Sequence, residues 1–160
     1  MEKHPFAASF RDLIVYQKAK ATAKRVFDLS KSFPKEELYS LTDQVRRSSR
    51  SIGGQIAEAW AKRRYPNHFV AKLTDADGEQ NESQHWVDTA EDCQYIDAVV
   101  AAELRHEFSQ IGRMLQRMID RAEEFRGDEY TGVREAECPY VTNADFSVTS
   151  AEHRTLNTEH

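Results

Sequence analysis

The sequence lacks the features that identify disulfide-rich, zinc-binding, membrane-spanning and secreted proteins. It has two cysteines in 160 residues, Cys93 and Cys138, so neither a disulfide framework nor a zinc knuckle is predicted, and both read as free thiols. It also lacks a run of about 18 apolar residues that could span a membrane. The N-terminus has no basic region followed by an apolar stretch and a small-residue cleavage site. A cytoplasmic protein without a membrane span is therefore predicted.

Strand signals and glycine-rich phosphate loops are also missing, and helical periodicity is what remains. The first predicted helix covers residues 10–31, with Ser9 as its cap and Asp12 at the third position. The second starts at Pro34, a good first helical residue, and runs to about residue 64. The inward faces of these helices are predicted to be Val15, Tyr16, Ala19, Ala23, Val26, Phe27 and Ser30 on the first, and Leu41, Val45, Ser49, Ile52, Ile56 and Trp60 on the second.

Two further helices are predicted after a short connection at residues 65–67. The third runs from about residue 69 to 96, and its middle is unusually polar, so part of it is expected to face polar partners. The fourth, residues 101–125, has the clearest apolar stripe in the chain. The predicted inward faces are Phe69, Leu73, Ala76, Gln80, Ser83, Val87 and Ala90 on the third helix, and Leu104, Phe108, Ile111, Leu115, Met118, Ile119, Ala122 and Phe125 on the fourth.

The fold class that follows is all-α, a four-helix bundle over residues 10–126 preceded by an N-terminal arm at 1–9. Residues 127–160 show no helical periodicity of apolar residues and are predicted to be a mainly disordered tail. The alternative is a segment that docks on a neighbouring subunit.

The second helix has the least ordinary sequence. Gly53 and Gly54 are adjacent in it, and each costs about 1 kcal/mol relative to alanine within a helix. Close packing of a neighbouring helix along Gly53 and Ala57 is the preferred explanation, and a kink or chain reversal is the alternative. Basic residues bracket this strip, namely Arg46, Arg47, Arg50, Lys62, Arg63 and Arg64.

Charge is distributed unevenly along the chain. Residues 1–72 hold 15 Lys/Arg and 7 Asp/Glu, whereas residues 73–160 hold 7 and 20. In one hypothesis the six basic residues of the second helix, with Lys18, Lys24 and Arg25 of the first, form a patch that binds the phosphates of a nucleic acid. In the other, a self-assembling scaffold, the same arginines pair with acids of the next copy, taken from Glu79, Glu82, Asp88, Glu91 and Asp92.

An enzymatic reading rests on two Glu-x-x-His units, Glu82 with His85 and Glu103 with His106, which resemble half of a di-metal carboxylate site. Their helical phase places them away from the predicted inward faces, and the first two helices offer no inward glutamate. Neither a metal nor another cofactor is therefore predicted, and Cys93 is not expected to be a nucleophile beside Glu91 and Asp92.

The second helix carries a motif made of Gln44, Arg46, Arg47, Ser51, Ile52 and Ile56–Glu58 in one register. With further matches over positions 10–122, the chain resembles the small proteins encoded in intervening sequences of bacterial 23S ribosomal RNA genes, a set related to accessory proteins of diversity-generating retroelements. Gly53, Gly54 and Gln55 depart from that pattern, as do Ala59 and Trp60. The matching residues are Phe10–Leu13, Val15, Gln17, Ala19, Gln44, Arg46, Arg47, Ser51, Ile52, Ile56–Glu58, Phe69, Leu73, Ala76, Gly78 and Glu82.

The resemblance implies an antiparallel up-down bundle that assembles as a ring of five copies, with nucleic-acid binding and no known catalysis. We therefore expect a non-catalytic homo-oligomer, a homopentamer by resemblance, whose partners are RNA or another nucleic acid, or a nucleic-acid enzyme. Trp86 lies off the inward face of the third helix and is either an interface residue or one shielded by the rest of the chain. The expected oligomer interface comprises Gly53, Ala57, Trp60, Glu79, Glu82 and Trp86.

Overall fold

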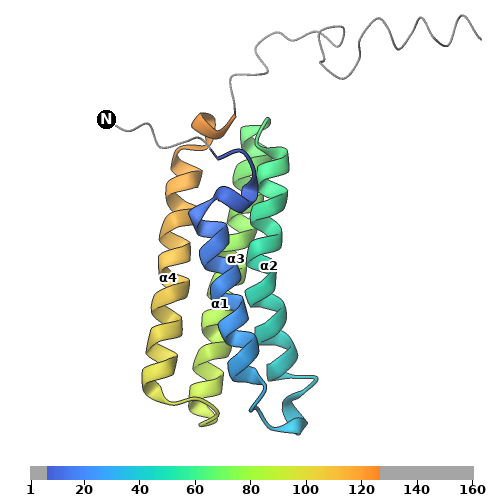
Figure 1. Ribbon diagram of the computed structural model, residues 1–160, viewed down its shortest axis with the longest axis vertical. Helices are drawn as coiled ribbons and strands as arrows, with labels where there is room; N and C mark the ends of the chain where they lie inside the picture. Colours follow the sequence, from blue (N-terminus) through green and yellow to red (C-terminus); the bar gives the residue numbers. More distant parts are fainter. Residues whose placement is uncertain (1–6, 127–160) are drawn as a thin grey trace, which may run out of the picture. The chain divides into compact units, whose positions relative to one another are not determined.

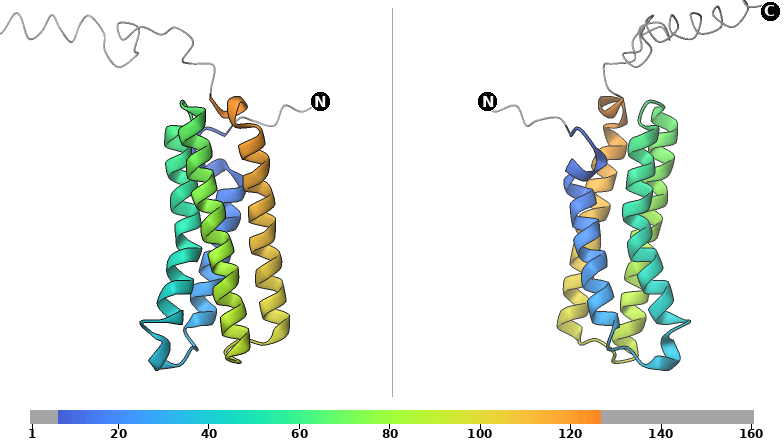
Figure 2. Two further views of the ribbon diagram at one scale, coloured as in Figure 1. Left: turned by 180° about the vertical axis from the view of Figure 1, so that it is seen from behind. Right: turned by 45° about the vertical axis from the view of Figure 1, so that its right-hand side comes forward.

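The chain folds into a bundle of four α-helices in the computed structural model, which describes residues 7–126 (Figure 1). Successive helices run in opposite directions, and each packs against the next, with α1 also packing against α4 (Figure 2). The predicted antiparallel up-down bundle is confirmed, and no strand occurs within residues 7–126. The helices are α1 (Ile14–Ser30), α2 (Leu41–Lys62), α3 (Pro66–Asp92) and α4 (Ala98–Asp120).

The core follows the predicted faces closely in α3 and α4. All seven residues predicted for the third helix are buried, and Phe69 and Phe108 are fully enclosed. On α2 the buried face ends at Ala59, and the predicted Trp60 is only partly buried. On α1 the predicted core residues Tyr16, Ala23 and Phe27 are half-buried, because they border a groove on the α2 side.

The first two helices begin later than predicted. The capping box of Ser9 and Asp12 is present, but it starts a 3-10 turn at Phe10–Asp12, and Leu13 is extended before α1. Pro34 likewise precedes only the 3-10 turn Lys35–Glu37. The Glu37 carboxylate then accepts hydrogen bonds from the Ser40 hydroxyl and, at 3.3 Å, from the Leu41 N–H, and so caps α2. These bonds hold the pKa of Glu37 below its ordinary value, with the Ser40 hydroxyl contributing most.

The third and fourth helices differ from prediction at both ends. Pro66, predicted to lie in a connection, is the first residue of α3. The predicted end near residue 96 is wrong, because Gln94 adopts a left-handed φ of 59° and the Tyr95 N–H returns to the Ala90 carbonyl at 2.9 Å. Asp97 caps α4 through a 2.8 Å bond from the Val100 N–H, and the predicted residues 122–125 form a separate 3-10 turn.

The polar middle of α3 does face polar partners, which belong to the same chain. Ser83 donates to the Glu79 carbonyl at 2.8 Å, and its hydroxyl lies 3.0 Å from that of Ser48 on α2. Buried Gln80 donates to the Asp77 carboxylate at 3.0 Å and accepts from Gln84 at 2.8 Å. Because these groups satisfy one another, the bundle encloses a polar layer without leaving their hydrogen bonds unmade.

Gly53 and Gly54 lie within an unbroken α2, so the kink or chain reversal is excluded. The predicted close approach of a second helix is not present within the chain either. A Cβ built at Gly53 would meet Tyr16 Cε2 at 3.6 Å, an ordinary contact, and one at Gly54 would have no neighbour within 4 Å. Within the described part of the chain, packing therefore requires neither glycine.

Replacing Gly54 by alanine should raise the free energy of unfolding by about 1 kcal/mol, since alanine is the better helix former. The added methyl group meets nothing, so no packing penalty offsets this gain. Chemical denaturation of wild-type and Gly54→Ala protein at one protein concentration measures the difference. A loss of stability would mean that another molecule packs against this position.

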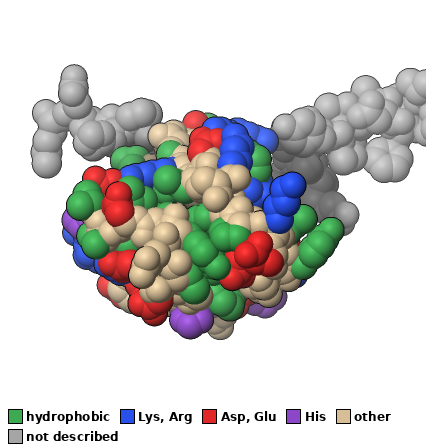
Figure 3. All heavy atoms as spheres, turned by 90° about the horizontal axis from the view of Figure 1, so that it is seen from below, with side chains coloured by type: hydrophobic (Ala, Val, Ile, Leu, Met, Phe, Trp, Pro, Cys, Tyr) green, Lys and Arg blue, Asp and Glu red, His purple; other side chains and the backbone are tan. Residues whose placement is uncertain are grey.

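The end of the bundle that carries the α1–α2 and α3–α4 connections shows apolar side chains interspersed with acidic ones (Figure 3). Leu38 and Tyr39 in the first connection are 46% and 91% exposed, and Val99 in the first turn of α4 is 68% exposed. Cys93 is an exposed free thiol. None of the helices within residues 7–126 is long and apolar enough to cross a membrane. Cys138 and the predicted tail at 127–160 lie outside the described residues.

Candidate nucleic-acid interface

An open groove of about 410 Å³ runs between α1 and α2. Its floor is made of small residues, among which Ala19 and Ser49 are each 1% exposed. Tyr16 and Phe27 line it as half-buried aromatic side chains, and Lys20, Lys24 and Arg50 are exposed at its rim. Tyr16, Ala23 and Phe27 of α1 are only half-buried because they border this groove.

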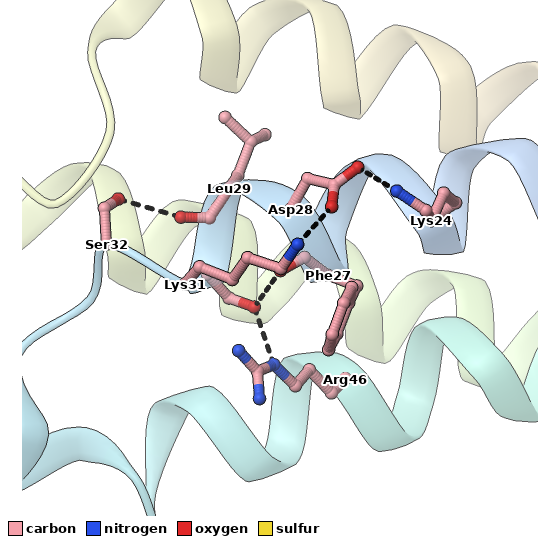
Figure 4. A network of polar contacts seen from close by, with 8 residues as sticks. Lys24, Phe27, Asp28, Leu29, Lys31, Ser32 and Arg46 are labelled. Atoms are coloured by element: carbon pink, nitrogen blue, oxygen red, sulfur yellow. Dashed lines mark hydrogen bonds and ion pairs between the residues drawn. The ribbon is translucent and has the colours of Figure 1, made fainter.

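Three cations surround the ring of Phe27 at one end of this groove. The guanidinium carbons of Arg46 and Arg50 lie 4.8 Å and 5.2 Å from the ring centroid, and the Lys31 ammonium lies 4.7 Å from it. Figure 4 shows Lys31 at the end of α1 and Arg46 on the facing helix α2, both beside Phe27. Each cation gains from the negative face of the ring, so Phe27 holds positive charges close together.

Arg46 is the most firmly held of the three. Its Nε donates to the Ser30 hydroxyl at 2.7 Å, and that hydroxyl donates in turn to the Phe27 carbonyl at 3.0 Å (Figure 4). Arg50 makes only the ring contact within the described residues, and its guanidinium is exposed. Arg46 is therefore a fixed charge of the interface, whereas Arg50 can meet a ligand without breaking a hydrogen bond.

We call this surface the basic groove and define its cations as Lys20, Lys24, Lys31, Arg46 and Arg50. Asp28 pairs with Lys24 and, at 2.9 Å, with Lys31, and these bonds lower the Asp28 pKa, that from Lys24 most. Of the carboxylates within residues 7–126, it alone forms an ion pair with any of the five. Five cations against one carboxylate leave an excess of positive charge suited to a polyanion.

The structure separates the other predicted phosphate-binding residues from this groove. Arg25 pairs with Glu103 and Glu107 of α4, and Lys18, seven residues earlier, lies on the same side of α1. Arg47 lies 3.7 Å from Asp43, and its charge also acts on Glu79 of α3, where burial and the Glu82 charge outweigh it and leave the Glu79 pKa raised. Only Lys24, Arg46 and Arg50 of the nine predicted residues meet in the basic groove.

The basic end of α2 forms a group of its own. Arg63 covers the Trp60 ring at 4.2 Å and donates to the Trp60 carbonyl at 2.9 Å. Arg64 lies 5.6 Å from the Tyr65 ring centroid, and Lys62 is exposed. At 1.5 Å per residue, Lys62 lies about 18 Å along the helix from Arg50. A long polyanion would be needed to span both groups.

Sequence reasoning missed Lys20, Lys31 and Phe27 as members of a site. It placed Phe27 on the inward face of the first helix and assigned neither lysine to a site. The missed signal is their spacing, because Lys20, Lys24, Phe27 and Lys31 follow one another at four, three and four residues, which aligns them on one side of a helix.

The predicted interface residues lie on two different sides of the bundle. Gly53 and Ala57 lie one turn apart on the α1 flank of α2, and Trp60 packs partly against the core. On α3, the Trp86 indole donates to Glu82 at 3.0 Å. Glu79 has its pKa raised, first by burial and then by the nearby Glu82 and Asp75 charges. The six predicted interface residues therefore do not form one continuous surface of the chain.

The side chains of the two Glu-x-x-His units are engaged in other contacts or exposed. Glu103 pairs with Arg25, and exposed His106 lies with Nε2 2.8 Å from the Gln110 amide nitrogen. Glu82 binds Trp86, and His85 is exposed beside that indole. Over the described range 7–126, no three His, Cys, Asp or Glu side chains lie close enough to hold a metal ion.

Comparison with known proteins agrees with this fold. The sequence profile of a family described as 23S rRNA-intervening sequence protein matches residues 11–117. The chain is also similar to the crystal structure of a protein with unknown function from the S23 ribosomal protein family of Bacteroides thetaiotaomicron. The two are 27% identical, and the match has a TM-score of 0.61 and covers 67% of this chain and 96% of that chain. No curated protein matches the sequence.

Proposed function

The chain belongs to the 23S rRNA-intervening sequence protein family, and we propose that it is a non-catalytic, cytoplasmic homo-oligomer that binds RNA or another nucleic acid through the basic groove. The observation that carries the proposal is the convergence of Lys31, Arg46 and Arg50 on Phe27, with Asp28 as their one paired carboxylate among the described residues.

Such a surface recognises phosphate rather than sequence. Lysine and arginine side chains displace the counterions condensed on a nucleic acid, and the free energy gained depends steeply on salt. The α1 and α2 sides of the groove both carry cations, so a phosphate backbone lying along the groove would contact both. A ring of five copies, the proposed oligomer, would repeat the groove and add avidity.

The proposal is tested by light scattering of the protein alone and with a structured RNA, at low and at physiological salt. The wild-type protein should form an oligomer whose mass rises when RNA is added at low salt. The variant Lys20→Glu/Arg50→Glu should remain an oligomer of the same mass and should not gain mass with RNA. An oligomer that ignores RNA at low salt would refute the nucleic-acid proposal, and a monomer would refute the assembly proposal.

The alternative function is a scaffold in which the groove cations pair with acids of the next copy. Two of the five acids predicted to pair with the next copy already have a partner in the same chain, because Arg105 of α4 forms ion pairs with Asp88 at 2.8 Å and with Glu91 at 2.5 Å. Glu79 and Glu82 form no ion pair within residues 7–126, and Asp92 is exposed. The unpaired, partly buried Glu79 is the feature that favours this alternative.

Replacing Glu79 by glutamine separates the two functions. The pKa of Glu79 is raised in the folded chain, so ionisation of this side chain opposes folding. The destabilisation is absent below the ordinary glutamate pKa of about 4.3, where the carboxyl is protonated in both states. It grows as the pH rises from there through the raised pKa of the folded chain. The isolated fold therefore predicts that Glu79→Gln is more stable than wild type at pH 7, and that the difference disappears near pH 4. Denaturant titrations of both proteins at pH 7 and at pH 4 measure this difference in stability.

The scaffold predicts the opposite sign at neutral pH. In a scaffold, an arginine of the next copy would pair with the Glu79 carboxylate. Loss of that carboxylate would weaken the oligomer and make it dissociate more easily on dilution. Lower stability and a smaller scattering mass for Glu79→Gln at pH 7 would favour the scaffold over the nucleic-acid binder.

A further inference from the structure

The floor and the sides of the basic groove differ in a way that suits a flat ligand. Gly53, Ala19 and Ala23 give the groove a floor without bulky side chains, between the half-buried rings of Tyr16 and Phe27. Packing within the chain does not require the glycine, since a Cβ there would make only an ordinary 3.6 Å contact with Tyr16. What the missing side chain provides is open space in the groove.

That space has the size and lining of a small-molecule site. Its volume of about 410 Å³ lies in the range of about 300–1,000 Å³ that ligand sites occupy. The interior is mainly apolar and aromatic, and the charged groups stand at the rim. A ligand that fits this arrangement has a flat apolar body and anionic groups attached at its edge.

Arg50 provides a stacking surface as well as a charge. Its guanidinium already lies over Phe27, with the guanidinium carbon 5.2 Å from the ring centroid. Unpaired bases stack on aromatic rings and on guanidinium planes, whereas bases in a duplex are already stacked and paired. Lys20 and Lys24 face Arg50 across the rim, where phosphates on either side of an inserted base would lie.

We infer that the basic groove holds an unpaired base of a single-stranded nucleic acid, stacked between Tyr16 and Arg50, with the flanking phosphates on Lys20, Lys24 and Arg50. The inference rests on the proposed function and adds two points to it. The ligand is single-stranded, and part of its affinity comes from a base rather than from phosphate alone.

Wild-type protein tests the inference without any substitution. Its affinity is measured for an oligothymidine of about 12 nucleotides and for a strand of equal length and charge with stable abasic sites in place of every base. The oligothymidine should bind at least about fivefold more tightly, since each stacked base contributes that much or more. Equal affinities would overturn the inference while leaving phosphate binding intact. If neither strand bound at low salt while the structured RNA still did, the single-strand inference alone would be overturned, whereas loss of binding to all three would overturn the proposed function as well.

The variant Gly53→Leu locates the base in the groove. The leucine side chain fills the space beside Tyr16 without changing charge, so the preference for oligothymidine over the abasic strand should disappear while salt-dependent binding remains. Gly54→Leu is the matched control, because Gly54 is exposed, a Cβ there has no neighbour within 4 Å, and the residue does not line the groove. Circular dichroism verifies that both variants are folded. A folded Gly53→Leu protein that keeps the full preference would overturn the assignment of the base to this groove.

Discussion

The variant Lys20→Glu/Arg50→Glu is expected to bind structured RNA at least about 100-fold more weakly than wild type at about 50 mM salt, because each phosphate contact contributes about tenfold at that salt. Neither side chain has a carboxylate partner within residues 7–126, and both are exposed at the groove rim. The substitutions therefore remove phosphate contacts without leaving a buried group unpaired. Fluorescence anisotropy with labelled RNA measures the affinity, and circular dichroism confirms the fold.

A charge-matched control separates the groove from the net charge of the molecule. Arg113 and Arg117 of α4 are exposed, have no ion-pair partner within the described residues, and are not among the residues that line the groove. Arg113→Glu/Arg117→Glu changes the total charge by the same amount. If the two double variants lost affinity equally, binding would depend on overall charge, and the groove assignment would be wrong.

Phe69→Ala is expected to lower the free energy of unfolding by about 3–5 kcal/mol, the usual cost of deleting a fully buried aromatic side chain. Phe69 has no exposed surface, and its ring lies 5.3 Å from that of Phe125 in the 3-10 turn after α4. The substitution removes a core contact and one that holds this turn against the bundle. Chemical denaturation at a fixed protein concentration measures the loss, since dissociation of an oligomer contributes to it.

Tyr39→Ala provides the comparison, because this side chain is 91% exposed. Its replacement should change the stability of the isolated fold by no more than about 0.5 kcal/mol. Similar losses for Phe69→Ala and Tyr39→Ala would contradict the core described here. A loss confined to Tyr39→Ala that grows on dilution would instead identify the exposed end of the bundle as an interface between copies.

The sequence predicted correctly most of the residues that are fully buried in the bundle. The face of α3 from Phe69 to Ala90 was predicted in full, polar Gln80 and Ser83 included, since helical phase alone determines which residues share a face. The same reasoning failed for Tyr16, Ala23 and Phe27 of α1. Periodicity shows that an apolar face exists, but how far the neighbouring helices cover it depends on their spacing.

The residues predicted as one basic patch lie on several sides of the bundle, for a related reason. The sequence predicted that basic residues bracket the strip at Gly53 and Ala57, but helical phase could not tell which flank of α2 would meet α1. That depends on the handedness of the bundle, which periodicity does not encode. As a result Arg25 was assigned to a phosphate site, whereas it binds Glu103 and Glu107 of α4.

Helix ends depended on single contacts that no pattern revealed. Pro34 and the acids after it are a good helix start by composition, yet the Glu37 carboxylate caps Leu41 and accepts a 3.1 Å bond from the Tyr95 hydroxyl of the α3–α4 connection. That tertiary contact favours a turn at residues 38–40, and α2 begins after it. A contact between segments 58 residues apart lies outside local sequence reasoning.

The central claim, that the basic groove binds nucleic-acid phosphates, is tested most directly by the salt dependence of RNA affinity in wild-type and Lys20→Glu/Arg50→Glu protein. Five groove cations predict a slope of about −3 to −5 in a plot of log affinity against log salt for wild type, and a slope shallower by about 2 for the variant. Equal slopes in the two proteins, or affinity independent of salt in wild type, would contradict the claim.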